Sequence, residues 1–532
     1  MKKIERAIVS VFDKSGVLEF VKVLVNDFGV EILSTGGTGR LLEQNGISYT
    51  QISEYTKSPE MFNGRVKTLH PKIEGGILYR RELDKDDAIK YDIPPIDMVV
   101  CNLYQFKEAI SKADITLEEA LEMIDIGGPT MIRAAAKNFP DVVVIPNSRY
   151  YDEIVREMRE NKGHVSDNIR ASLAQDVFAI MADYNAAIAN YLQNYYDPNA
   201  LMGNNLIKVY EKVQDCRYGE NWDQAAAYYR DLSCKYGLHS MKQLGGKAIS
   251  FNNYLDIDGC MQMLLDLGPE NYTTAILKHT SPNGMALDRD NQLKSVQMAF
   301  SCDPMSAFGG IWGVNQELLK EVADFIVNKE KIFVEVLMAP SFEPEALEIL
   351  KTKKNLRILE YGDLLDKRDE IYKQLEIRAT LGGAVVQEYD YKPVVKEWNV
   401  VSEKQVNDLE KEALIFAYKV SKWAKSNSAC FAQLNDTGMY SIGIGAGQQS
   451  RVHVVKLAIQ KAIEFGHKEE LVDSVMGTDS FFPFPDGLEA AVDAGCKAII
   501  NPGGSIRDEM IIEKANELGC ALVFCGKRVF RH

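Results

Sequence analysis

Short apolar runs alternate with amphipathic stretches in the N-terminal part of the chain. Residues 7–12, 30–33, 98–104 and 142–145 have the length and composition of buried strands. After the first run, apolar residues recur at helical spacing from about residue 17 to 28, which predicts a helix. Strands that alternate with helices are typical of a parallel sheet covered by helices. The pattern therefore predicts an α/β domain.

A longer amphipathic stretch, from about residue 168 to 195, predicts one extended helix with Ser166 as its N-cap. The Asp-Pro-Asn and Gly-Asn-Asn sequences within residues 197–205 are expected to break that helix. A chain of 532 residues is long enough for at least two domains. We therefore predict domains at residues 1–200 and 201–532.

In the second domain, the apolar residues 275–277 predict a buried strand that carries Lys278 and His279 at its end. Pro282 and Gly284 are expected to stop this strand in a tight turn. Active sites of α/β folds commonly lie at such strand ends, and a histidine can move a proton near neutral pH. A neighbouring lysine can hold an oxyanion or lower the imidazole pKa. An isolated Lys-His pair is more often a solvated strand end, so other motifs are needed to show whether this pair has a function.

Composition narrows the function classes. The 61 Lys and Arg residues against 76 Asp and Glu residues give a net charge of −15, which argues against general binding to nucleic acid or to anionic membranes. No apolar run is long enough to span a bilayer, and no signal-peptide segment is expected. The nine cysteines are scattered, without a CxxC pair, which is typical of free thiols in a reducing cytoplasm.

Two stretches predict local anion sites in this acidic chain. Residues 34–38, Ser-Thr-Gly-Gly-Thr, follow a predicted strand and precede a helix, the arrangement in which backbone N–H groups and hydroxyls hold phosphate. No GKS or GKT follows, so this is not a Walker motif, and an ordinary tight turn is the alternative. Residues 63–72 place three cations and one histidine in a loop bounded by Gly and Pro. That loop either binds an anion or is simply solvated.

Further motifs are weaker when taken singly. Residues 124–130 open a predicted helix that carries Arg133 and Lys137 on one face. The GxGxG sequence at 443–447 lacks the spacing of a dinucleotide site. No HExxH motif and no HxE with PCxxC is present, so we expect no zinc and no other metal centre.

Taken together and in order, these motifs span essentially the whole chain. They comprise residues 34–38, 64–71, 133–138, 217–221, 278–279, 306–310, 426–428, 445–448, 481–484 and the tail around Arg528. In this set the chain resembles the bifunctional purine-biosynthesis family that joins AICAR formyltransferase to IMP cyclohydrolase. It departs from the commoner bacterial pattern at Trp222-Asp223, where Pro-His is frequent, and at Asn283, where a cysteine is frequent.

The resemblance implies a fold and a reaction. The fold class is α/β, with an N-terminal methylglyoxal-synthase-like parallel-sheet domain and a C-terminal, duplicated cytidine-deaminase-like domain that holds no zinc. The first reaction transfers a formyl group from the cosubstrate 10-formyltetrahydrofolate, a folate, to AICAR. The second closes formyl-AICAR to IMP with loss of water. The resemblance also implies a cytoplasmic homodimer that uses no redox cofactor and binds neither nucleic acid nor membrane, and it is compatible with a monovalent cation.

The resemblance further assigns roles to residues. For formyl transfer, His279 is the base, Lys278 tunes it, and Asn427 orients the formyl group. The remaining binding residues of that site are Arg217, Tyr218, Gly309, Arg451, Phe481, Asp486 and Arg528. For cyclisation, Lys137, Asp125 and Tyr104 handle protons. The nucleotide is held there by Ser10, Lys14, Ser34, Thr35, Gly36, Gly37, Thr38, Arg65, Lys67 and Thr68.

Two other functions fit part of the sequence. The first domain alone resembles a lyase of the methylglyoxal-synthase type, which a dihydroxyacetone-phosphate assay would detect. A ligand-sensing regulatory module is the second alternative, and it predicts nucleotide binding without turnover. That alternative gives no role to Lys278 and His279.

Overall fold

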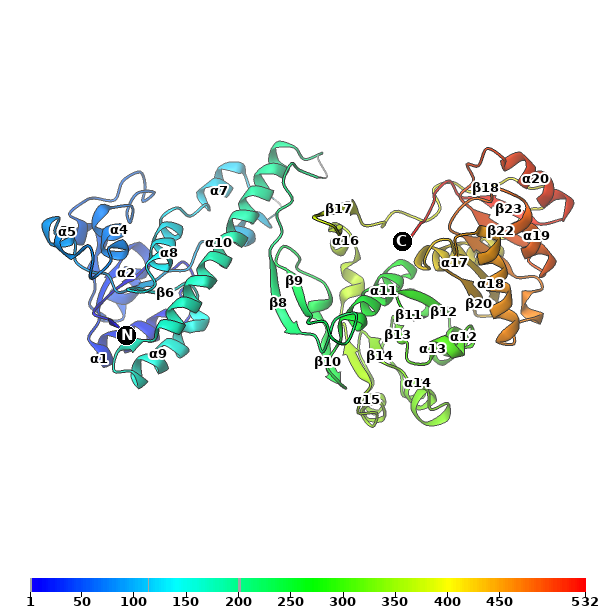
Figure 1. The fold of residues 1–532 in the computed structure, drawn as a ribbon, viewed down its shortest axis with the longest axis horizontal. Coiled ribbons are helices and arrows are strands. Elements are labelled where there is room, and N and C mark those ends of the chain that lie inside the picture. The colour runs from blue at the N-terminus through cyan, green and yellow to red at the C-terminus, as the bar shows by residue number, and fades with distance from the viewer. Residues whose placement is uncertain (1, 113, 200–201) are drawn as a thin grey trace. The chain divides into compact units, whose positions relative to one another are not determined.

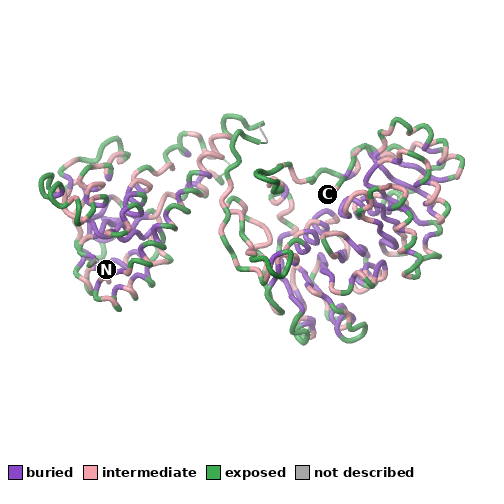
Figure 2. Tube along the Cα trace, in the orientation of Figure 1, coloured by how far each residue is buried: buried purple, intermediate pink, exposed green. Residues whose placement is uncertain are grey.

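The computed structural model describes residues 2–112, 114–199 and 202–532 (Figure 1). The chain divides into two compact units, Met1–Val209 and Tyr210–His532. The boundary predicted near residue 200 falls on Ala200 and Leu201, which lie outside the described residues. No helix in the described part of the chain is both long and apolar enough to cross a membrane. Buried residues concentrate on the strands and on one side of the helices within each unit (Figure 2).

Unit 1 is built on a five-stranded parallel sheet in the order β4-β3-β2-β5-β6. The strands are β2 (Arg6–Val9), β3 (Glu31–Ser34), β4 (Thr50–Gln51), β5 (Met98–Val100) and β6 (Val143–Ile145). Strand β5 is apolar and fully buried, and β2 and β3 are buried after their first residues, as expected for a parallel sheet that is covered on both faces. The predicted α/β fold with a parallel sheet is confirmed for this unit.

Helices connect these strands and pack on the sheet. The longer ones are α1 (Val17–Phe28), α2 (Gly36–Gln44), α4 (Pro71–Leu78), α8 (Gly127–Lys137), α9 (Tyr151–Glu160) and α10 (Asp167–Tyr196). Shorter elements are α3 (Ile52–Thr56), α5 (Lys85–Lys90), α6 (Phe106–Ile110), α7 (Leu117–Glu122), η1 (Ser148–Tyr150) and the pair β1 (Lys2–Lys3) with β7 (His164–Val165). The predicted helices at 17–28 and 168–195 are confirmed. Ser166 occupies the N-cap position of α10, but its side chain makes no capping hydrogen bond.

Two strands of unit 1 end before the residues predicted as their ends, and the residues that follow them line a pocket. Strand β2 ends at Val9 and β5 at Val100, so residues 10–12 and 101–104 leave the sheet at its carboxyl edge. The chain runs from β2 to β3 on one side and later returns to β5 on the other. The crevice outside the carboxyl ends at such a reversal is where ligands bind in open α/β sheets.

Unit 2 contains a twelve-stranded mixed sheet in the order β10-β15-β14-β13-β11-β12-β20-β19-β21-β22-β23-β18. Its first six strands are β10 (Lys242–Gly245), β11 (Tyr272–Lys278), β12 (Ser281–Asp288), β13 (Ile311–Val314), β14 (Val336–Ala339) and β15 (Arg357–Glu360). The other six are β18 (Asn399–Val400), β19 (Ala429–Leu434), β20 (Gly438–Gly445), β21 (Val475–Thr478), β22 (Ala498–Asn501) and β23 (Ala521–Phe524). The two sets have the same topology. In each, an antiparallel hairpin is followed by three mutually parallel strands and flanked by an antiparallel edge strand.

The helices of unit 2 repeat in the same way. The first set is α11 (Phe251–Leu267), α12 (Gln292–Ser301), α14 (Lys320–Asp324) and α15 (Pro344–Lys351). The second is α17 (Asp408–Trp423), α18 (Arg451–Glu464), α19 (Asp486–Asp493) and α20 (Asp508–Glu517). Helices α11 and α17 share one apolar core across both halves, whereas the opposite face of the sheet has a separate core in each half. The antiparallel β12–β20 pairing joins the halves.

Smaller elements complete unit 2. Two isolated hairpins are formed by β8 (Tyr210–Asp215) with β9 (Ala227–Asp231) and by β16 (Leu375–Thr380) with β17 (Gly383–Glu388). The short helical segments are η2 (Leu238–Ser240), α13 (Pro304–Ala307), η3 (Phe325–Lys329), η4 (Leu364–Lys367), α16 (Arg368–Ile371) and η5 (Glu469–Leu471).

The Lys278–His279 strand differs from its predicted ending. The chain turns at His279 and Thr280, which both adopt positive φ, and Pro282 and Gly284 lie inside the following strand β12. The expectation that they stop the chain is wrong, because a register shift opposite Leu277 gives Pro282 a place in the ladder. Lys278 pairs with Ser281 across a tight hairpin.

Candidate functional site

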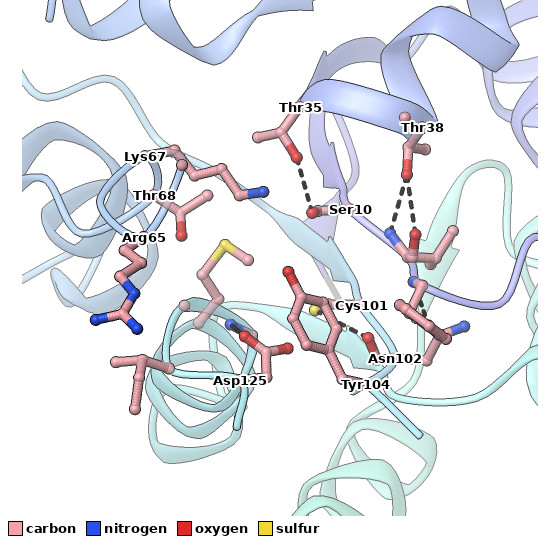
Figure 3. Close-up of a pocket in the computed structure, with 18 of the residues that line it drawn as sticks. Ser10, Thr35, Thr38, Arg65, Lys67, Thr68, Cys101, Asn102, Tyr104 and Asp125 are labelled. Carbon is pink, nitrogen blue, oxygen red and sulfur yellow. Dashed lines mark hydrogen bonds between the residues drawn. The ribbon is translucent and has the colours of Figure 1, made fainter. Parts of the chain in front are cut away.

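Unit 1 holds a pocket of about 600 Å³ at the carboxyl edge of its sheet (Figure 3). Most of the predicted cyclisation residues line it: Ser10, Lys14, Thr35, Gly37, Thr38, Arg65, Lys67, Thr68, Tyr104 and Asp125. They come from the ends of β2 and β5, the start of α2, the loop before α4 and the start of α8. Residues far apart in the sequence therefore meet in one cavity.

One side of this pocket is formed by the first turn of α2. The helix begins at Gly36, so the predicted glycine-rich loop is the helix N-terminus, whose N–H groups and partial positive charge favour an anion. The hydroxyls of Ser10 and Thr35 lie 3.0 Å apart. Lys14 Nζ donates to Thr38 Oγ1 over 3.0 Å, and burial followed by the charge of Lys67 lowers the Lys14 pKa. Hydroxyls, an ammonium group and helix N–H groups together fit a phosphate.

Asn102 joins the segments that follow β2 and β5 by hydrogen bonds at one side of the pocket. The sequence analysis did not single out this residue. Its Oδ1 accepts hydrogen bonds from the backbone N–H groups of Phe12 and Asp13 at 2.6 and 3.1 Å. Its Nδ2 donates to the Asp13 carbonyl over 2.9 Å. A polar residue directly after a predicted strand was the available signal, but many such residues are only solvated.

The loop before α4 brings two predicted cations to the pocket. Figure 3 shows the Lys67 ammonium directed toward the same space as the hydroxyls of Ser10 and Tyr104. Arg65 forms an ion pair with Glu122, which also lines the pocket. A Cβ on Gly127 would stand 2.6 Å from Thr68 Oγ1, so this close approach of loop and helix requires glycine.

Asp125 and Tyr104 form the proton-active part of the pocket. Asp125 Oδ1 accepts from the Gly128 N–H over 3.0 Å at the start of α8. Burial raises the Asp125 pKa, while the backbone N–H of Gly128 and the charge of Lys67 oppose that shift. Burial and then the charge of Asp125 raise the pKa of Tyr104. A carboxyl group that is partly desolvated and next to a phenol is suited to proton transfer near neutral pH.

Three predicted residues of this site lie elsewhere. Ser34 is fully buried and donates to the Val9 carbonyl over 2.7 Å. Gly36 begins α2 but does not line the cavity. Lys137 is exposed at the other end of α8. Nine residues of helix separate it from Gly128, which at about 1.5 Å per residue is a distance of about 13 Å.

In unit 2, a cavity of about 220 Å³ gathers the first group of predicted formyltransferase residues. It is lined by Arg217, Tyr218, Lys278, His279 and Gly309. Lys278 Nζ donates to the Phe308 carbonyl over 3.0 Å, while the His279 side chain is exposed in the hairpin turn. Asp256 Oδ1 accepts from the Thr280 N–H over 2.6 Å and so fixes the turn. Burial raises the Asp256 pKa.

The same cavity contains residues that the sequence analysis missed. Glu335 and Arg357 both line it, and Arg357 Nη1 donates to Glu335 Oε2 over 2.5 Å. Arg357 also donates from Nε to the Ala248 carbonyl and is almost fully buried. Both residues lie at the ends of apolar strand segments. The sequence did not mark them as functional residues, because single charges at strand ends are common.

A second group of predicted residues lies apart from this cavity. Phe481 and Arg528 line another cavity of about 510 Å³ that shares no lining residue with the first. The Arg451 guanidinium lies 4.4 Å from the centre of the Phe481 ring and donates to the Phe481 carbonyl. Asp486 is exposed at the start of α19, where its Oδ1 accepts from the Gly487 N–H over 2.9 Å.

Asn427 lies near the hairpin rather than in either cavity. Its Nδ2 donates to the carbonyls of Gln448 and Gln449 at 2.8 and 3.2 Å. Two residues earlier, the Lys425 N–H donates to Ser281 Oγ over 3.4 Å, which links this loop to the Lys278 hairpin. Among the described residues, no group of three or more His, Cys, Asp or Glu side chains is placed to hold a metal ion.

Comparisons with known proteins agree with this architecture. A family model described as the AICARFT/IMPCHase bienzyme matches residues 135–461, and a model of the MGS-like domain matches residues 16–130. The chain is 43% identical over 537 residues to the bifunctional purine biosynthesis protein PurH of Acidithiobacillus ferrooxidans, with 100% of each sequence covered. It is also similar to the crystal structure of ForH, at 33% identity and a TM-score of 0.33, over 35% of this chain and 95% of that one.

Proposed function

This chain belongs to the AICARFT/IMPCHase bienzyme family, and from that premise we propose that each of its two units carries one of the two activities. The chain is a bifunctional purine-biosynthesis enzyme of the last two steps to IMP. We assign cyclisation of formyl-AICAR to unit 1 and formyl transfer from 10-formyltetrahydrofolate to AICAR to unit 2. The observation that carries this assignment is the pocket at the carboxyl edge of the unit 1 sheet, which combines a phosphate cradle with the Asp125–Tyr104 pair.

Cyclisation needs a proton removed, an oxyanion stabilised and water expelled. The carboxamide nitrogen attacks the formyl carbon, and the Asp125 carboxylate takes the proton from that nitrogen. Lys67 stabilises the negative charge on the former formyl oxygen. The protonated Asp125 returns its proton to this oxygen, and the Tyr104 hydroxyl donates a second as the oxygen leaves as water. The Tyr104 phenolate then takes the proton from the former formamide nitrogen as the ring C=N bond forms. The anion cradle around Thr35 and Thr38 holds the nucleotide phosphate.

We give Lys137 no step in this proposal, since it does not line the pocket, and its role in proton handling stays a prediction. Lys67 supplies the ammonium group instead, since it lines the pocket. The Ser34 hydroxyl donates a hydrogen bond to the carbonyl at the end of β2 and so stabilises the backbone beside the pocket.

Formyl transfer needs a base, because the amine of AICAR is a weak nucleophile. The amine attacks the formyl carbon of the folate, His279 accepts the amine proton, and the same proton passes to the folate nitrogen as it leaves. The Lys278 ammonium stabilises the tetrahedral oxyanion. Asn427 orients the formyl group, and Arg217 binds the nucleotide phosphate.

A homodimer would complete the formyltransferase site. The residues around Lys278 and those around Phe481 and Arg528 line separate cavities within one chain. A second copy can bring the Arg528 group of one chain to the Lys278 group of the other. The substrate would then bind where the two chains meet.

The topological repeat in unit 2 supports a duplicated cytidine-deaminase-like fold. Strands β10–β15 and β18–β23 of the two halves follow the same order and pairing. All nine cysteines are free thiols, and this supports a reducing, cytoplasmic location.

A direct assay tests the proposal. The purified chain is incubated with AICAR and 10-formyltetrahydrofolate, and separately with formyl-AICAR alone. We expect IMP in both reactions, and tetrahydrofolate only in the first. Dihydroxyacetone phosphate serves as the control substrate and should give no methylglyoxal. Failure to form IMP from formyl-AICAR would refute the assignment of unit 1.

A further inference from the structure

Phe12 is one of the exposed apolar residues that line the pocket of unit 1, together with Leu121 and Ile126. Its residue is 43% exposed, although most large apolar side chains of this unit are buried in the core. Among the described residues that line the pocket, only Phe12 and Tyr104 carry aromatic rings. An exposed phenylalanine gains little from folding, so the fold itself does not account for this side chain.

Hydrogen bonds to Asn102 hold the backbone at Phe12 and Asp13. The Phe12 N–H donates to Asn102 Oδ1 over 2.6 Å, and the next N–H donates to the same oxygen. Asn102 in turn donates to the Asp13 carbonyl. The main chain at Phe12 is therefore fixed at the carboxyl edge of the sheet, beside the pocket.

The two rings form a tilted pair. Their centroids are 5.1 Å apart, with 48° between the ring planes. Tyr104 lies close enough to Asp125 for the carboxylate charge to affect its hydroxyl group. The aromatic pair is thus at the proton-active side of the pocket, whereas hydroxyls and N–H groups form the anion cradle.

We propose that Phe12 is a specificity-determining residue that stacks on the heteroaromatic ring of the nucleotide in the cyclisation site. This inference rests on the proposed function of unit 1. An aromatic face adds favourable contact with any planar ring, while ribose phosphate without a base gains nothing from it. Because the purine of IMP offers a larger face than an imidazole, Phe12 stabilises bound product more than bound substrate.

The test compares a ligand that has the base with one that lacks it. Inhibition constants of IMP and ribose 5-phosphate are measured in the cyclisation reaction, so that only this site is observed. We expect Phe12→Leu to raise the inhibition constant of IMP about tenfold and that of ribose 5-phosphate less than about twofold, since stacking on one base is typically worth that much. The KM for formyl-AICAR should rise by a smaller factor than the IMP constant, with kcat nearly unchanged.

Two further variants make the result specific. Phe12→Tyr keeps the ring and should restore IMP inhibition. Phe178→Leu removes a similarly exposed phenylalanine, 48% exposed on α10 and outside the pocket lining, and should behave as the parent chain.

Two outcomes would overturn the proposal. An unchanged IMP constant in Phe12→Leu would show that no stacking occurs. An equal rise for IMP and ribose 5-phosphate would show that Phe12 only shapes the pocket. If the parent chain does not cyclise formyl-AICAR, the function proposed for unit 1 fails and this inference fails with it, a result distinct from the other two.

Discussion

The candidate sites of the two units differ in how complete they are within one chain. In unit 1, residues from five segments line one pocket at the carboxyl edge of a parallel sheet. In unit 2, some of the predicted residues line two cavities that share no lining residue, and Asn427, Arg451 and Asp486 line neither. Parallel strands deliver their carboxyl ends to one edge, so a pocket there forms within a single chain. The mixed sheet of unit 2 spreads its strand ends over both edges and offers no such common point.

This comparison predicts that the two activities respond to different perturbations. A change in unit 1 should affect cyclisation alone. Formyl transfer should depend on the Lys278 hairpin and also on association between chains.

The largest effect is expected for His279→Ala. Loss of a general base typically lowers the rate by a factor on the order of 10² to 10⁴. Formyl transfer should fall by that factor, while cyclisation of formyl-AICAR should remain normal. Separate assays of the two reactions on the folded variant measure the difference. His239→Ala, which changes a histidine outside the Lys278 cavity, is the control. Near-normal formyl transfer in His279→Ala would show that Lys278 and His279 are only solvated residues of a hairpin turn.

A similar loss in the opposite activity is expected for Asp125→Asn. Cyclisation should fall about a hundredfold, and formyl transfer should be spared. Because burial raises the Asp125 pKa, cyclisation by the parent chain should decline as the pH falls through that raised value. A pH profile of cyclisation checks this, and the decline should disappear from the residual activity of the variant.

Lys137→Ala should leave cyclisation within a few-fold of normal. A loss as large as that of Asp125→Asn would show that Lys137 belongs to the cyclisation site.

Dilution gives a smaller effect. Below the dissociation constant of the homodimer, specific formyl transfer should fall in proportion to the fraction of dimer, whereas specific cyclisation should stay constant. Both activities are measured over a dilution series alongside sedimentation or light scattering. Constant formyl transfer across the dimer-to-monomer transition would mean that one chain contains the whole site.

The smallest effect concerns the stability of unit 1. Burial raises the pKa of Glu74 to about 7, and its Oε1 atom has no hydrogen-bond partner. The folded state therefore binds a proton between about pH 4.5 and 7 that the unfolded chain has released, so stability is lost as the pH rises through 7. Glu74→Gln should raise the free energy of unfolding by about 1–2 kcal/mol at pH 8, a value reduced for partial exposure, and by little at pH 4.5.

Calorimetry of the full chain at both pH values measures this change. Only the transition of unit 1 should move. Equal stabilisation at pH 4.5 and pH 8 would mean that ionisation of Glu74 is not the cause.

Much of unit 1 could be predicted because its strands are short, uniformly apolar and separated by helices. The first predicted strand extended as far as Phe12, beyond its observed end. An apolar residue after a strand cannot be told from part of that strand until the strand pairing is known. The hairpin at His279 was harder to predict, because Thr280 is a β-branched residue, which rarely adopts positive φ. Glu335 and Arg357 reach the Lys278 cavity only through the successive pairing of β11, β13, β14 and β15. Pairing between distant segments is not encoded in any local pattern.

The seam between β12 and β20 has a consequence for the turns that precede these two strands. Antiparallel strands that pair Ala286 with Tyr440 and Asp288 with Gly438 are related by a local two-fold rotation. The turn that precedes β12 therefore lies at one edge of the sheet and the matching turn, before β20, at the other. The two halves of the sheet therefore contain two topologically equivalent turns. Only one reads Lys-His-Thr, while the other reads Asn-Asp-Thr and closes on its own Asn435 side chain. The symmetry of the sheet therefore does not extend to these turns, since one has Lys278 and His279 at the Lys278 cavity and the other is closed by hydrogen bonds to Asn435.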